Sequence, residues 1–134
     1  MSINLKITLI SFLLFLTIFT FAQDPNQVQK TPVEIASEQA DRLLRELKLN
    51  DYQLFMVDSV LQTNIAGVMD EFERMRKGGM QNPESYRDVQ KKWQTKTEDA
   101  FEKLLTIEQF DRYLRISGVP SRERKKRIEA LKKD

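Results

Sequence analysis

The chain has 134 residues with 22 Lys and Arg against 20 Asp and Glu, a formal net charge of +2, and it contains neither cysteine nor histidine. The absence of cysteine excludes a disulfide-stabilised fold, and the absence of histidine excludes histidine acid–base catalysis and the usual zinc ligand sets. There is also no glycine-rich phosphate loop and no G-x-S-x-G motif. We therefore predict no enzymatic activity, no cofactor, no metal site and no nucleic-acid partner.

Residues 1–22 have the pattern of a cleavable secretory signal peptide. Lys6 precedes a largely apolar run over residues 7–19, and the small residues Thr20 and Ala22 follow. An uncleaved membrane anchor is the alternative, but the run is short for a span of about 20 residues. Cleavage would leave 112 of the 134 residues, enough for one domain with a modest core. Residues 23–31 are polar and predict a flexible leader.

The first helix is predicted over residues 32–47. Thr31 is suited to the N-cap, Pro32 to the first helical position and Glu34 to the third, which completes a capping box. Apolar residues then recur at helical spacing and form a narrow stripe: Ala36, Ala40, Leu43 and Leu47.

A long second helix is predicted from the cap Asn50 to about Lys77, where Gly78 and Gly79 end it with a left-handed turn. Apolar residues follow each other every three or four positions: Leu54, Val57, Leu61, Ile65, Val68, Phe72 and Met75. Further apolar residues widen this stripe beyond what one partner helix would cover: Phe55, Met56, Val60 and Met69.

Asn82, Pro83 and Glu84 open a third helix that extends to residue 104. Its stripe is heptad-like, with Phe101 beside it: Tyr86, Val89, Trp93, Thr97, Ala100 and Leu104. Because only about four residues separate it from the second helix, we expect these two helices to form an antiparallel hairpin.

Two shorter helices complete the chain. Thr106 begins one with the apolar residues Phe110, Tyr113 and Leu114, and Gly118 and Pro120 end it. Ser121 is predicted to cap a basic helix over residues 122–133. Residues 119–134 hold seven Lys and Arg against three Asp and Glu, so this segment could attract acidic clients or anionic lipid, or be a solvated tail. No stretch alternates long enough for a strand, and the predicted fold is all-α with four to five helices.

Two helix starts share one pattern of an apolar residue, a capping residue, two spacers and a glutamine. The capping residue would accept a backbone N–H while the glutamine reaches back to the backbone of the cap. In each motif the leading leucine can pack on the residue one position after the glutamine, as a hydrophobic staple. The motif residues are Leu49, Asn50 and Gln53, then Leu105, Thr106 and Gln109.

The local pattern makes a prediction about stability. Replacing the cap, as in Thr106→Ala, should cost about 1 kcal/mol. Gln109→Ala should cost somewhat less, because the glutamine contributes only the reciprocal bond of the box.

The two motifs, their separation by 56 residues and the export signal resemble the Spy/CpxP family of bacterial periplasmic proteins, over roughly residues 35–116. The resemblance implies a thin, cradle-shaped homodimer of antiparallel helical subunits. From the residues we divide the chain after the leader into a helical domain over 32–118 and a basic C-terminal helix or tail over 119–134. The resemblance also implies a periplasmic, ATP-independent chaperone of envelope stress, or a partner of an envelope-stress sensor. The motif residues would act at helix starts. The chain departs from the family at Asn50, where the family favours Thr, and it lacks the histidines with which some relatives bind metal.

Two functions follow as hypotheses. In the first, a holdase binds unfolded clients on excess apolar surface of the second helix, for which we select Phe55, Met56, Val60, Met69, Phe72 and Met75. The alternative for any of these residues is that it fills a core. In the second, a regulatory adaptor docks one envelope protein, which would give a single saturable partner.

Overall fold

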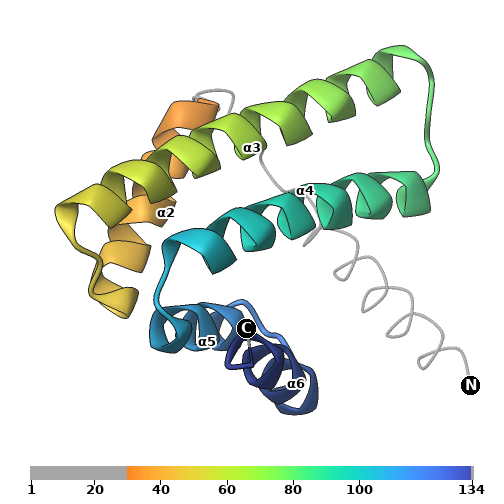
Figure 1. The fold of residues 1–134 in the computed structure, drawn as a ribbon. Coiled ribbons are helices and arrows are strands. Elements are labelled where there is room, and N and C mark those ends of the chain that lie inside the picture. The colour runs from red at the N-terminus through yellow and green to blue at the C-terminus, as the bar shows by residue number, and fades with distance from the viewer. Residues whose placement is uncertain (1–29, 134) are drawn as a thin grey trace, which may run out of the picture.

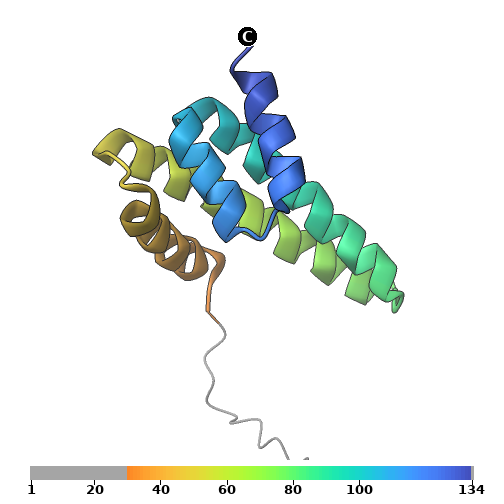
Figure 2. The same ribbon diagram turned by 90° about the horizontal axis from the view of Figure 1, so that it is seen from below.

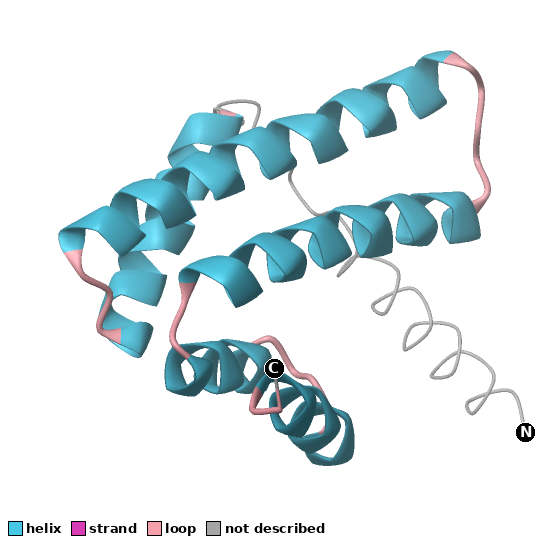
Figure 3. Ribbon diagram, viewed as in Figure 1, coloured by secondary structure: helices cyan, strands magenta, loops and turns pink. Residues whose placement is uncertain are grey.

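The computed structural model describes residues 30–133, which form five helices and no strand (Figures 1 and 3). The all-α prediction is therefore confirmed for this part of the chain. The predicted signal peptide over 1–22 and most of the leader over 23–31 lie outside the described residues. No helix within residues 30–133 is long and apolar enough to cross a membrane. The helices are α2 (Pro32–Leu47), α3 (Asp51–Lys77), α4 (Pro83–Leu104), α5 (Ile107–Ile116) and α6 (Ser121–Leu131).

The helices begin where the capping residues predict. Thr31 Oγ1 accepts the backbone N–H of Glu34 at 3.2 Å, and the Glu34 carboxylate accepts the backbone N–H of Thr31 at 2.7 Å. This hydrogen bond from the Thr31 backbone is the main reason why the pKa of Glu34 is lowered. Asn82 Oδ1 accepts the backbone N–H of Glu84 at 2.9 Å at the start of α4. Local side-chain bonds therefore satisfy donors that a helix start leaves open.

The last helix begins differently from the prediction. Ser121 is the first residue of α6 rather than its cap, and the N-cap is Pro120, which makes no side-chain bond there. The predicted cap at Ser121 is therefore wrong. The turn before it is closed by the backbone instead, with Gly118 at φ +83° and the N–H of Val119 donating to the carbonyl of Leu114 at 3.0 Å.

The helices α3 and α4 lie side by side and run in opposite directions (Figures 1 and 2). The helix α2 crosses the first half of α3, whereas α5 contacts both α2 and α4, and α6 packs on α5. The turn between α3 and α4 lies at the far end from these three shorter helices (Figure 1). Three short helices thus gather around one end of a long pair.

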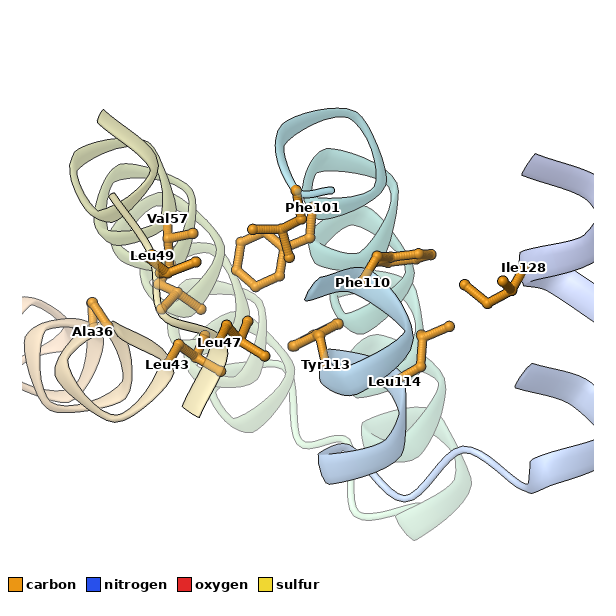
Figure 4. Close-up of a cluster of buried hydrophobic side chains, with 13 residues drawn as sticks. Ala36, Leu43, Leu47, Leu49, Val57, Phe101, Phe110, Tyr113, Leu114 and Ile128 are labelled. Atoms are coloured by element: carbon orange, nitrogen blue, oxygen red, sulfur yellow. The ribbon is translucent and has the colours of Figure 1, made fainter. Parts of the chain in front are cut away.

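The core lies at that end, between α2, α3, α4 and α5 (Figure 4). Its most deeply buried large side chains are Val57, Phe101, Phe110 and Leu114. The Tyr113 ring meets the Phe101 ring edge-on, with centroids 4.9 Å apart, a favourable aromatic geometry. Burial also raises the pKa of the Tyr113 phenol above its usual value. Ile128 brings α6 into the same cluster, so the basic segment belongs to the fold.

Residues 62–96, which we call the tip, contain no buried side chain. Here the second half of α3 packs on α4, and Ile65 also lies against the core cluster. Trp93 of α4 lies directly against Gly67 of α3, where an added Cβ would approach its Cη2 atom to 2.2 Å. The Trp93 indole donates a hydrogen bond to Glu71 Oε1 at 3.1 Å, and the ammonium of Lys96 lies 4.1 Å from the centroid of its ring. Trp93 therefore joins the two helices of the tip.

Candidate functional site

The two motifs meet in space. Asn50 Oδ1 accepts the backbone N–H of Gln53 at 2.8 Å, and Thr106 Oγ1 accepts that of Gln109 at 3.2 Å. The side-chain oxygen of each glutamine accepts the backbone N–H of its own cap, at 3.1 Å for Asn50 and 3.0 Å for Thr106. Both predicted capping boxes are confirmed.

The two glutamine side chains also bind each other, and we call them the glutamine pair. Gln53 Nε2 donates to Gln109 Oε1 at 2.8 Å, and Gln109 Nε2 donates to Gln53 Oε1 at 3.1 Å. Each amide nitrogen donates a second bond to the carbonyl that ends another helix. Gln53 reaches Leu104 at the end of α4 at 3.4 Å, and Gln109 reaches Leu47 at the end of α2 at 3.2 Å.

Each glutamine therefore satisfies the start of its own helix and the end of the helix that precedes the other motif. Gln53 is only 8% exposed, so an unpaired amide at this position would be costly. The leading residues Leu49 and Leu105 are buried in the same core cluster. The motif residues are thus a structural clamp that holds α2, α3, α4 and α5 together at one end.

A groove of about 460 Å³ opens beside this clamp, between the middle of α2, the middle of α3 and α4, and the end of α5. Apolar side chains from α3 and α4 form much of its wall, including Ile65, Val68 and Trp93. The full lining is Gln39, Arg42, Leu43, Leu61, Asn64, Ile65, Val68, Gln90, Trp93, Gln94, Thr97, Tyr113, Ile116 and Ser117.

The chemistry of the groove is distinctive for a chain in which 31% of residues are charged. Its lining includes no carboxylate and only one cation, Arg42, whereas four side-chain amides supply hydrogen-bond donors and acceptors. Asn64 donates to Thr97 Oγ1 at 2.8 Å and so joins α3 to α4 in the groove wall. This surface is suited to apolar and amide-bearing ligands rather than to ionic ones.

The side chains selected from the sequence as a client surface do not line this groove. Phe55 is 70% exposed and lies in a separate hollow beside α2, with Asp41, Asp51 and Asp58 around it. Phe72 contacts Tyr86, with ring centroids 5.1 Å apart, and helps to close the tip. Met56, Val60, Met69 and Met75 are partly buried. The structure thus spreads the selected residues along α3: Phe55 lies in the hollow beside α2, Val60 packs against the core cluster and Phe72 lies in the tip.

The groove residues that the sequence did not indicate are side-chain amides on α2, α3 and α4. Gln39, Gln90 and Gln94 gave no signal in the sequence because amides are common on solvated helix faces. Ile65 and Val68 belong to the apolar stripe of α3, but the stripe alone does not show which of its side chains stay accessible to solvent in the groove. Trp93 belongs to the apolar stripe of α4. Its large ring fits against α3 because Gly67 has no side chain there.

Within residues 30–133 no three carboxylate side chains are placed so that they could hold a metal ion together. Comparisons with family models, curated proteins and solved structures find no match to this chain.

Proposed function

We propose that the protein is an ATP-independent chaperone that binds unfolded or partly folded proteins in the groove between α2, α3, α4 and α5. The observation that carries this proposal is the lining of the groove, which combines apolar side chains with amides and has no carboxylate. Apolar contact is non-directional and tolerates many sequences, whereas amides can pair with a polypeptide backbone in either direction. Such a surface favours weak binding of many extended segments over tight binding of one ligand.

The proposal includes export to the periplasm, with residues 1–22 as the signal peptide. It also includes a cradle-shaped homodimer in which the long α3–α4 pair forms the body. The support within one subunit is apolar surface left open at large side chains, among them Val33, Tyr52 and Met80, which are 56%, 67% and 46% exposed. A mass measurement in solution tests the dimer directly.

The function is tested by the aggregation of an unrelated protein, such as chemically reduced α-lactalbumin, followed by light scattering without nucleotide. We expect suppression at near-stoichiometric ratio. Val68→Asn places an amide on the apolar wall of the groove and should weaken suppression several-fold. Phe55→Asn is the matched control outside the groove and should leave suppression within about twofold.

The outcomes separate the possible surfaces. If Phe55→Asn abolishes suppression and Val68→Asn does not, clients bind the surface around Phe55 that the sequence suggested. If several test proteins aggregate undisturbed, the chaperone function is wrong. A pull-down from envelope extract then tests the alternative function of a regulatory adaptor. An adaptor should retain one dominant partner whose binding is saturable.

A further inference from the structure

We propose that the outer face of α6 binds electrostatically to the surface of an anionic lipid bilayer. This inference does not depend on the groove or on the proposed chaperone function. It begins with the division of the charges of α6 between an inner and an outer side.

Two of the arginines of α6 are used inside the fold. Arg124 forms an ion pair with Asp111 of α5 at 2.7 Å, and Arg127 forms one with Glu98 of α4 at 2.8 Å. Arg127 also lies 5.5 Å from the centroid of the Phe110 ring, and Ile128 is buried in the core. At 3.6 residues per turn these side chains share one side of the helix with Leu131. They fix the orientation of α6 on α5 and α4.

The other side of the helix presents cations to solvent. Within residues 30–133 none of these outer cations forms an ion pair, and all are exposed: Arg122, Lys125 and Lys126 of α6, and Lys132 and Lys133 directly after it. The exposed Glu129 lies among them, and Glu123 lies on the flank, where it faces the hollow between α6 and α4. Figure 2 shows α6 (dark blue) at an edge of the molecule, so a flat surface can approach this side.

The composition of this face favours a bilayer over a protein partner. Protein interfaces are poor in lysine and are anchored by buried aromatic or apolar side chains. The large apolar side chains that are exposed, Val33, Tyr52, Phe55 and Met80, all belong to other segments. Lipid headgroups need no such anchor, because each Lys or Arg near an anionic surface adds to binding independently.

The test measures co-sedimentation of the purified full chain with vesicles of phosphatidylcholine alone and with vesicles that contain 30% phosphatidylglycerol. The difference between the two vesicle types reports charge and is insensitive to the apolar run over residues 7–19. We expect binding to the anionic vesicles that is lost in about 0.5 M salt. Lys125→Gln with Lys126→Gln should weaken this binding roughly 25-fold, about fivefold per cation.

The matched control is Arg76→Gln with Arg87→Gln, which removes the same net charge from exposed positions near the α3–α4 turn. It should change vesicle binding less than threefold. The proposal is overturned if the protein does not prefer anionic vesicles, or if both double variants lose binding equally. Binding to soluble polyglutamate without binding to vesicles would also overturn it and would assign the face to an acidic polypeptide.

Discussion

The two ends of the α3–α4 pair are stabilised by different kinds of packing. At the motif end, the glutamine pair and a buried cluster connect four helices, and Phe101 is completely buried. The tip is built from α3 and α4, no side chain of residues 62–96 is buried, and contacts such as Phe72 with Tyr86 are partly solvated. A two-helix contact cannot exclude water from all sides, so it holds its shape through a few specific pairs. The comparison predicts that the motif end supplies most of the stability.

The largest effect should come from emptying the core at the motif end. Phe101→Ala is expected to lower the free energy of unfolding by about 3–5 kcal/mol, because it removes a fully buried ring. Phe72→Ala, the same truncation in the tip, should cost only about 1–1.5 kcal/mol, since this ring is partly exposed and loses mainly its contact with Tyr86. Urea unfolding of both variants measures the difference, and equal losses would contradict the comparison.

The next largest effect should come from the glutamine pair. Gln53→Ala and Gln109→Ala should each lower the free energy of unfolding by about 2–3 kcal/mol, because each removes both hydrogen bonds between the two amides and the bond to one helix-end carbonyl. The double variant should lose much less than the sum of the two. Thr106→Ala, which removes only a cap, should cost about 1 kcal/mol. The tertiary bonds thus reverse the order expected from the motif alone, and additive losses would show that the two glutamines act separately.

A smaller effect is expected in the tip at Gly67. Gly67→Ala would place its Cβ 2.2 Å from Trp93 Cη2, so the indole must move, at about 1–3 kcal/mol. Trp93 is the single tryptophan, and its fluorescence should shift to longer wavelength as it leaves α3. Gly78→Ala is the control, because Gly78 has φ −78° and its added Cβ would meet no atom closer than 3.3 Å. An unchanged spectrum in Gly67→Ala would contradict this packing.

The smallest expected effect is on the stability of the fold at acidic pH. Lys92 donates a hydrogen bond to Glu71 at 2.5 Å and thereby lowers the pKa of that carboxyl. A lowered pKa in the folded state stabilises the fold above the ordinary pKa of glutamate, and this contribution is lost as pH falls through the folded pKa. Glu71→Gln should therefore reduce the loss of stability between about pH 5 and pH 3, seen in thermal melts. If Glu71→Gln leaves this acid-dependent loss of stability unchanged, the hydrogen bond from Lys92 does not contribute in this way.

Sequence alone determined the helices of residues 30–133 and most of their limits, because caps and stops act within about four residues of the backbone. Asn50 with Gln53, Thr106 with Gln109, and Gly79 with its left-handed turn can each be recognised in this way. Ser121 shows the limit of such reasoning, since a residue suited to a cap lies one position inside the helix.

Only the tertiary structure decided which side chains of different helices contact each other. The side chains of Gln53 and Gln109 are 56 positions apart, and nothing in either motif indicates that the two amides bind reciprocally. The same holds for the groove, whose amides come from helices that pack across one another, and for α6, where packing selects Arg124 and Arg127 for internal ion pairs. Hydrogen bonds and ion pairs between distant segments depend on the angles at which helices cross, and helical periodicity does not contain those angles.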